Sequence, residues 1–273
     1  MSSRFKGKTI WITGASSGIG KQLAIQLNAL GANVIISARR VERLTYIDDH
    51  CPCRENMTVV PLDLTNHESV VNAVKKVESL GSLDLLIHNA GIAQKGLVIE
   101  NEIAIDRQVM ETNFFGTVDL TKEVMPIFLK QKKGWFAVVT SIAGVVGVPG
   151  RSGYSASKHA LHGYFDSLRA ELIDCDLNVT IIMPGFIKTN ITKKELTGHG
   201  KAYGKLEKSH ALGMDPDKAA KKIIKRLKPS RQNIIVGGFE VTSVYIQRIF
   251  PKLYNFIVRR HPMRWWRKVW GRK

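Results

Sequence analysis

Cysteine is scarce in this chain of 273 residues, which contains only Cys51, Cys53 and Cys175. An odd, sparse set is not a disulfide framework, and the first two lie too close together for an ordinary disulfide loop. A metal site would need further soft ligands, and only His50 lies near them in the sequence. We therefore expect a cysteine-bearing surface loop, no bound metal, and a reducing, cytoplasmic environment.

Long apolar runs are also absent. The first eight residues lead straight into the segment 9–13 without the apolar region of a signal peptide. The most apolar late segment, 241–258, falls short of the ~20 apolar residues that span a bilayer, because Arg248, Pro251 and Lys252 interrupt it. These absences predict a cytoplasmic protein, attached at most peripherally to the inner face of a membrane.

Acidic residues are missing from 248–273, which we treat as a separate tail. Its basic residues supply half of the net charge of +18, and they are Arg248, Lys252, Arg259, Arg260, Arg264, Arg267, Lys268, Arg272 and Lys273. The aromatic residues between them are Phe250, Tyr254, Phe256, Trp265, Trp266 and Trp270. Pro251 and Pro262 argue against one continuous helix.

A basic and aromatic tail suits an anionic membrane surface, where each basic residue near the surface adds about 1 kcal/mol of binding. Two alternatives stay open. The tail packs on its own domain or on a second copy with its aromatic rings buried, or it binds nucleic acid, for which no recognised motif is present.

Strand-like and helix-like segments alternate through the rest of the chain. The expected strands are Lys8–Thr13, Asn33–Ala38, Thr58–Pro61, Leu83–His88, Trp135–Ser141, Asn178–Met183 and Gln232–Val236. The expected helices are Lys21–Leu30, Glu68–Leu80, Asp106–Gln131, Tyr154–Cys175 and Asp217–Leu227. This alternation predicts an α/β fold over residues 1–247, a single doubly wound parallel sheet with helices on both faces. Residues 186–214 fit neither period, and loops of this length are often lids.

Glycines punctuate the turn from the first strand to the first helix, at Gly14, Gly18 and Gly20. They permit close backbone approaches that a Cβ would block. The free N–H groups at the start of the helix would face a bound pyrophosphate. A tight strand-to-helix turn would use the same residues, so the loop needs supporting context.

Tyr154 and Lys158 supply part of that context. Their spacing puts both side chains on one face of a helix, and a lysine charge beside a tyrosine favours the phenolate. The lysine would bring the pKa of the phenol from its usual ~10 toward the working pH of a proton donor or acceptor. By itself the pair is a common surface pattern.

Together these motifs make the sequence resemble a classical short-chain dehydrogenase/reductase with a Rossmann-type fold, over roughly residues 8–240. The markers follow the family's order: the glycine loop 13–20, His88 to Gly91, Asn113, Ser141, Tyr154 with Lys158, and Pro184 with Gly185 before Thr189. One departure is His88, where the family more often has asparagine. We expect this change to affect strand packing rather than chemistry.

The resemblance implies a role for each matching residue. Tyr154 would be the general acid in reduction and the base in oxidation, Lys158 would bind the nicotinamide ribose and lower the pKa of Tyr154, and Ser141 would hydrogen-bond the substrate oxygen. Asn113 would hold a water in a proton relay. The implied cofactor-binding residues are Gly14, Ser16, Ser17, Gly18, Ile19, Gly20, Ser37, Arg39, Arg40, Asp63, Leu64, Asn89, Ala90, Gly91, Tyr154, Lys158, Pro184, Gly185, Ile187 and Thr189.

Cofactor choice follows from the end of the second expected strand. A related NAD enzyme usually has an acidic residue there for the ribose 2′-hydroxyl, whereas this chain has Ser37, Ala38, Arg39 and Arg40. Two guanidinium groups favour a 2′-phosphate through charge-assisted hydrogen bonds. We predict NADP(H), with Arg39 as the preferred contact. The alternative is a salt-bridged surface arginine.

The substrate side is harder to predict. Ser141, Ile142, Val148, Tyr154, Phe186 and Tyr203 are the candidates, since pocket walls are usually apolar with few polar groups. Several of them are equally suited to the core. Arg151 would bind an acidic group or would be an exposed loop arginine.

The predicted function is NADP(H)-dependent hydride transfer to or from a carbonyl or secondary alcohol of a lipophilic small molecule, such as a lipid, steroid or retinoid-like compound. One alternative is a 3-oxoacyl-[acyl-carrier-protein] reductase, whose acidic carrier the lysine-rich lid would attract. Another is a catalytically silent NADP-binding scaffold on a membrane surface. The family resemblance also implies a homodimer or homotetramer, and membrane association in some members.

Overall fold

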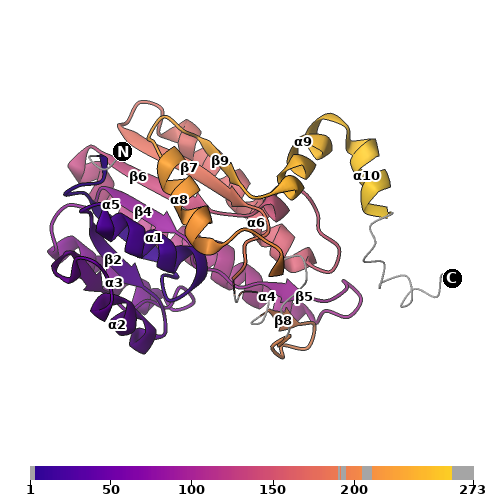
Figure 1. Ribbon diagram of the computed structural model, residues 1–273, viewed down its shortest axis with the longest axis horizontal. Coiled ribbons are helices and arrows are strands. Elements are labelled where there is room, and N and C mark those ends of the chain that lie inside the picture. The colour runs from indigo at the N-terminus through magenta and orange to yellow at the C-terminus, as the bar shows by residue number, and fades with distance from the viewer. Residues whose placement is uncertain (1–3, 190, 192–194, 205–210, 260–273) are drawn as a thin grey trace.

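Seven parallel strands form one sheet in the order β3-β2-β1-β4-β6-β7-β9. The computed structural model describes residues 4–259 except 190, 192–194 and 205–210. Helices cover both faces of the sheet (Figure 1), which confirms the Rossmann-type fold. The strand order reverses between β1 and β4, and loops that follow these two strands diverge to leave a crevice.

The strands of this sheet are β1 Thr9–Thr13, β2 Asn33–Ser37, β3 Met57–Val59, β4 Leu85–His88, β6 Gly134–Val139, β7 Leu177–Pro184 and β9 Asn233–Val236. A separate pair consists of β5 Gln94–Lys95 and β8 Leu196–Thr197. The helices are α1 Gly18–Ala29, α2 Val41–Asp49, α3 His67–Ser79, α4 Ile103–Met110, α5 Gly116–Gln131, α6 Ser152–Glu171, α8 Pro216–Arg226, α9 Thr242–Ile249 and α10 Pro251–Arg259. Helix α2 was not expected from the sequence; it buries only Leu44 and Ile47.

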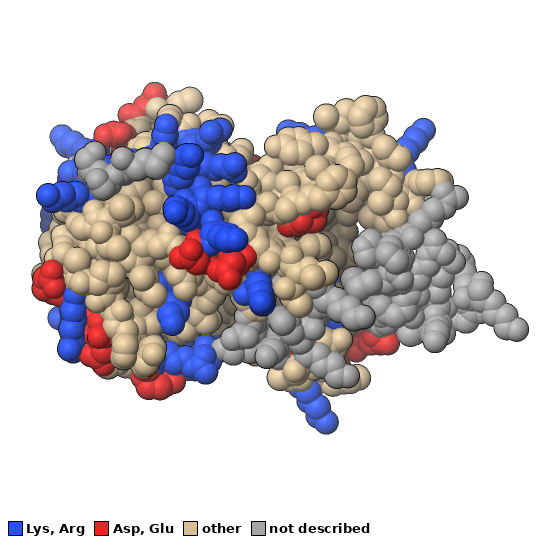
Figure 2. Space-filling model, viewed as in Figure 1, with Lys and Arg blue, Asp and Glu red and all other residues tan. Residues whose placement is uncertain are grey.

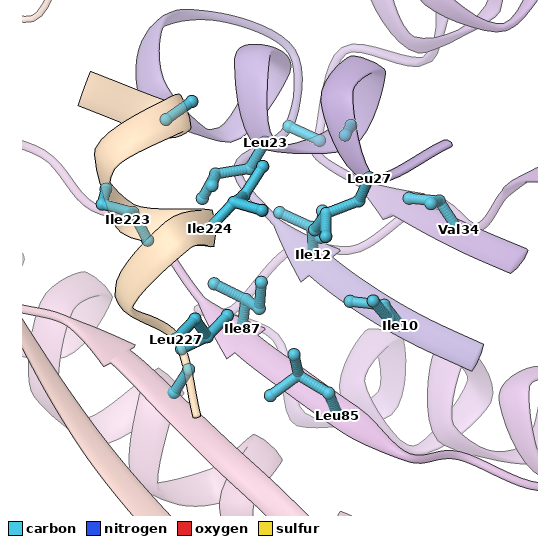
Figure 3. Packing of buried hydrophobic residues seen from close by; sticks show 14 of the residues in the cluster. Ile10, Ile12, Leu23, Leu27, Val34, Leu85, Ile87, Ile223, Ile224 and Leu227 are labelled. Carbon is cyan, nitrogen blue, oxygen red and sulfur yellow. The ribbon is translucent and has the colours of Figure 1, made fainter. Parts of the chain in front are cut away.

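Apolar side chains alternate between the two faces of the sheet, as pleating requires. In β1, Ile10 and Ile12 join the core under α1 and α8, whereas Trp11 joins the core under α3, α5 and α6. Figure 3 shows Leu23 of α1 and Ile224 of α8 on the same side of the sheet as Ile12. Full burial of such a side chain stabilises the fold by roughly 1.5–3 kcal/mol.

The expected helix Asp106–Gln131 is interrupted. A π-helical turn, Glu111–Phe115, joins α4 to α5. Such turns insert one extra residue and often mark functional sites. This one carries Asn113, whose side chain is fully buried.

The C-terminal hairpin, α9 with α10, projects from the domain beyond β9 (Figure 1). The chain breaks between the helices at Phe250, next to Pro251, so the proline argument against one continuous helix is confirmed here. The boundary expected at 247 falls inside α9, and Pro262 lies outside the described residues. None of the helices in the described part of the chain is long and apolar enough to span a bilayer.

Candidate functional site

A cleft of about 590 Å³ lies at the carboxyl ends of the parallel strands. Its walls come from the segments that follow β1, β2, β4, β6 and β7. Because parallel strands all end at the same edge, residues far apart in the sequence meet there. The cleft is large enough for a small-molecule cofactor and substrate.

Backbone geometry requires the glycines of the first loop. Gly14 and Gly18 have φ of 66° and 60°, a left-handed conformation that side chains rarely adopt. A Cβ on Gly14 would lie 2.7 Å from the Cα of Ala90, and one on Gly20 would overlap the amide of Asn89. Gly20 does not line the cleft; it lets α1 approach the loop after β4. The free N–H groups at the start of α1 therefore face a cradle that fits a pyrophosphate.

The loops after β1 and β4 are joined by hydrogen bonds. Thr13 Oγ1 accepts from the backbone N–H groups of Asn89 and Ala90, each at 3.1 Å. The Asn89 side chain donates to the carbonyl oxygen of Thr13 at 3.0 Å. These contacts fix the distance between the two walls of the cofactor side.

The two arginines after β2 both line the cleft, but their surroundings differ. Arg40 Nη2 donates to Ser16 Oγ in the glycine loop at 3.3 Å, whereas Arg39 is exposed. Ser37 is buried, and its hydroxyl accepts from Trp11 Nε1 at 2.8 Å. The sequence favoured Arg39 as the phosphate contact, whereas the geometry places Arg40 on the phosphate loop.

Ser141, Tyr154 and Lys158 line the cleft together. Tyr154 and Lys158 project from α6, and the Lys158 Nζ lies 5.9 Å from the centroid of the Tyr154 ring. Lys158 Nζ also donates to the carbonyl oxygen of Val139 at the end of β6, at 3.0 Å. Ser141 follows β6 and accepts from the backbone N–H of Ala143 at 3.1 Å.

Asn113 lies behind this wall rather than in it. Its Oδ1 accepts from the backbone N–H of Ile92 at 2.8 Å, and its Nδ2 donates to the Ile92 carbonyl and to Ser157 Oγ, both at 2.9 Å. A Cβ on Gly91 would lie 3.0 Å from Asn113 Oδ1 and 3.5 Å from Lys158 Nζ. Only glycine leaves the space between them open.

Comparisons with known proteins agree with this geometry. The family model for short chain dehydrogenases matches residues 8–199. The chain belongs to the short-chain dehydrogenase/reductase family. It is 38% identical over 256 residues to a dehydrogenase/reductase SDR family member 7B from Xenopus laevis, covering 90% of this chain and 79% of that protein. A dehydrogenase/reductase SDR family protein 7-like from Drosophila melanogaster is 35% identical over 269 residues, covering 96% and 82%.

Solved structures share the fold. A short-chain dehydrogenase/reductase from Burkholderia phymatum, in complex with NAD, has a TM-score of 0.80 at 21% identity, with 91% of this chain and 95% of that chain covered. A short-chain dehydrogenase from Burkholderia cenocepacia, in complex with NADP, has a TM-score of 0.78 at 25% identity, with 93% and 98% covered. Membership of the short-chain dehydrogenase/reductase family, shown by the family model and the relatives above, makes this chain an oxidoreductase that acts on CH–OH groups or the corresponding carbonyls.

The nicotinamide of such an enzyme supplies or accepts the hydride when bound, and this chain's own side chains handle the proton. Burial raises the pKa of Tyr154, and the charge of Glu195 adds to it, while the hydrogen bond with Ser141 and the charge of Arg151 act against it. The expected lowering by Lys158 is not among these causes. A protonated phenol suits a proton donor in reduction.

Lys158 itself responds to burial. Its side chain is nearly inaccessible to solvent, and desolvation lowers its pKa to about 8. The ammonium is therefore charged at neutral pH, and its pKa lies only slightly above that pH. Such a pKa suits a residue that takes part in proton transfer beside Tyr154.

A buried ion pair beside Tyr154 was not expected from the sequence. Arg151 precedes α6, and its guanidinium pairs with the carboxylate of Glu195. Their side chains are 11% and 0% exposed, so Arg151 is not an exposed loop arginine. Glu195 belongs to the lysine-rich segment 186–214, and no sequence motif around it predicts that it forms a buried ion pair. The ion pair connects the segment 186–214 to the start of α6, the helix that carries Tyr154 and Lys158.

The expected substrate residues are only partly brought together. Ile142, Val148 and Phe186 line the cleft. Tyr203 does not; its ring instead lies under the Lys95 Nζ, which is 4.1 Å from the ring centroid. The backbone N–H of Tyr203 donates to the carbonyl oxygen of Glu195 at 2.8 Å. Sequence reasoning missed several lining residues, among them Gln108, Thr112, Ile191 and Leu196.

The other expected cofactor residues line the cleft, and they are Ser17, Ile19, Asp63, Leu64, Pro184, Gly185, Ile187 and Thr189. His88, the departure from the family pattern, lies beneath it. The imidazole packs against Phe136 and Phe165, contacts Thr121 Oγ1 at 3.0 Å, and has a pKa lowered to about 3 by burial. This uncharged ring packs within the core, as its sequence position suggested.

Proposed function

We propose that this chain is an NADP(H)-dependent reductase or dehydrogenase of lipophilic carbonyls or secondary alcohols. The observation that carries the cofactor choice is the pair Arg39 and Arg40 at the end of β2, with Arg40 hydrogen-bonded to Ser16 of the glycine loop. A 2′-phosphate placed there would meet two guanidinium groups and a hydroxyl, and residues 37–40 at the end of β2 include no carboxylate to accept from a ribose hydroxyl. The solved relatives include complexes with either cofactor, so the choice rests on these residues.

The substrate class follows from the charge balance of the other side. Ile142, Val148 and Phe186 give an apolar wall, and the hydroxyls of Ser141 and Tyr154 are the polar groups that would meet a carbonyl oxygen. The Arg151 charge is already compensated by Glu195, which disfavours its use as a contact for a substrate carboxylate. A neutral, lipophilic carbonyl compound fits this wall best.

The test is a rate comparison. A panel of neutral aliphatic, aromatic and steroidal ketones, matched keto acids and a 3-oxoacyl thioester is reduced with NADPH or NADH. The proposal expects a larger kcat/KM with NADPH and with neutral ketones. A preference for NADH would overturn the cofactor assignment, and a preference for keto acids or for the thioester would overturn the substrate class.

The acyl-carrier alternative is a prediction from the sequence. Four of the lysines that would attract an acyl carrier, Lys193, Lys194, Lys205 and Lys208, lie outside the described residues. The cytoplasmic location and the homo-oligomer are also predictions. A catalytically silent scaffold is disfavoured because Asn113, Ser141, Tyr154 and Lys158 are all present and assembled.

A further inference from the structure

The outer face of the C-terminal hairpin is apolar and exposed, and the described part of the hairpin is mostly tan in Figure 2, with basic groups at its edges. Six large side chains are 45–64% accessible to solvent, and they are Tyr245, Ile249, Phe250, Leu253, Phe256 and Ile257. Leu253, Phe256 and Ile257 are spaced three and four residues apart on α10, so they share one helix face. Contiguous apolar surface on a soluble domain marks an interaction site more often than scattered single residues do.

The opposite face of α10 is held against the domain. Tyr254 Oη donates to the carbonyl oxygen of Gly147 at 3.0 Å, and the half-buried Val258 lies one turn later on the same side. At the base of the hairpin, Glu240 Oε1 accepts from the backbone N–H of Phe186 at 2.8 Å. These contacts fix the orientation of the hairpin, so its apolar face points away from the domain.

The same contacts place the hairpin beside the substrate side of the cleft. Phe186 lines the cleft, and so does Val148, the residue after Gly147. Figure 1 shows α9 and α10 standing away from the sheet on the side of α6 and β9. A molecule held at the hairpin surface would thus lie near the apolar wall of the site.

Charge identifies the partner. Between 241 and 259 the chain has Arg248, Lys252 and Arg259 and no acid, and the sequence 260–273, outside the described residues, adds six basic residues and three tryptophans. A second copy of this chain carries the same +18 charge, which opposes self-association through a basic face. Nucleic acid would use stacked aromatic rings rather than Leu253 and Ile257. Apolar and basic groups together match an anionic bilayer.

We propose that the C-terminal hairpin docks this enzyme on an anionic lipid bilayer through Leu253, Phe256 and Ile257, and that lipophilic substrate enters the cleft from that surface. Docking stands independently of the enzymatic assignment, whereas the entry route rests on the proposed function. Because the exposed face carries the docking, substitutions there leave the cleft intact.

Co-sedimentation of the full 273-residue protein with vesicles tests the docking. One vesicle type is phosphatidylcholine, and the other is equal parts phosphatidylcholine and phosphatidylserine. The double variant Leu253→Ser/Phe256→Ser is compared with Ile173→Ser, which replaces an 81% exposed side chain after α6 as a matched control. We expect wild type and the control to sediment with the vesicles that contain phosphatidylserine. The double variant should bind these vesicles at least about tenfold more weakly, because it lacks two apolar side chains that the bilayer would bury.

Activity and size measurements separate the other outcomes. Reduction of the best neutral ketone of the panel should proceed at the same rate in all three proteins. If the wild type reduces no ketone of the panel, the proposed function is rejected and the docking result stands. The docking proposal is wrong if wild type stays in the supernatant or if the double variant sediments equally. It is also wrong if ultracentrifugation shows that the hairpin face joins two copies, or if RNA binds it more tightly than the vesicles do.

Discussion

The cofactor side of the cleft is built from residues 13–19, 37–40 and 89–91, which lie at or just after the ends of the neighbouring strands β1, β2 and β4. The substrate side is built from Ser141, Arg151, Phe186 and Leu196, which come from loops, a helix start and the small pair of strands. On the first side, parallel strand register and tight turns place the residues. On the second, a few contacts between distant segments place them.

Those long-range contacts are polar, and they range from the buried ion pair to one exposed hydrogen bond. They are the pair of Arg151 with Glu195, the bond from Tyr254 to Gly147, and the bond from Phe186 to Glu240. A buried polar group that loses its partner is costly, while a glycine turn depends only on its own backbone. The two sides should therefore respond differently to substitution, in ways that the following measurements sharpen or break.

Tyr154→Phe should have the largest effect. It removes the proton donor and leaves both walls in place, so kcat for ketone reduction should fall by roughly a thousandfold, within the range of lost general acid catalysis. The dissociation constant of NADPH, measured by nicotinamide fluorescence, should stay unchanged. A variant that turns over at the wild-type rate would remove Tyr154 from the mechanism.

Arg151→Met should destabilise the folded protein through its substrate side. It leaves the fully buried Glu195 carboxylate without its ion-pair partner, a change that typically costs about 3–5 kcal/mol in free energy of unfolding. The double variant Arg151→Met/Glu195→Leu should recover most of that loss in urea unfolding. Equal losses in the single and double variants would show that the charge is not the cause.

Arg40→Ala tests the cofactor side, with Arg39→Ala as its matched control. Loss of a hydrogen bond to a charged phosphate should raise the KM for NADPH by roughly ten- to a hundredfold and leave that for NADH unchanged. The Arg39 variant should change less, because that side chain is exposed and Arg40 holds the glycine loop. The reverse order would restore the prediction from the sequence.

The pH dependence of kcat/KM should show the lowered pKa of Lys158. Its ammonium is charged below about 8, the value to which burial lowers its pKa, and loses its proton above it. The kcat/KM for NADPH-dependent reduction should therefore decline as pH rises through this value. Lys158→Arg keeps its charge, so its decline should begin at higher pH. A profile that is flat for the wild type would contradict the expectation.

Glu195→Gln should have the smallest effect on catalysis. Besides burial, the side chains that shift the pKa of Tyr154 are Ser141, Arg151 and Glu195. The Glu195 charge raises the pKa of Tyr154, so removing it lowers that pKa, and the rise of alcohol oxidation with pH should move to lower pH. The maximal rate should hardly change. A shift to higher pH would show that Glu195 acts through structure alone.

Much of the fold and of the cofactor side could be predicted. The seven strands lie close to the expected ranges because apolar periodicity marks buried strands. The glycine loop was predictable because its turn needs positive φ at Gly14 and Gly18, which glycine adopts readily. Helix α2 and the π-helical turn escaped prediction. The first has few apolar residues to mark it, and the second leaves helical periodicity nearly unchanged while carrying Asn113.

By itself the sequence determined the parallel sheet, the nucleotide loop and the joint presence of Ser141, Tyr154 and Lys158, because these depend on periodicity and on short spacings along the chain. Only the tertiary structure decided that Arg40 rather than Arg39 meets the glycine loop, that Glu195 pairs with Arg151, and that Tyr203 lies outside the cleft. It also fixed which face of α10 is exposed. Each of these depends on contacts between segments that are separate in the sequence. Periodicity and short spacings do not specify such contacts, and burial strengthens those that it covers, the Arg151–Glu195 pair above all.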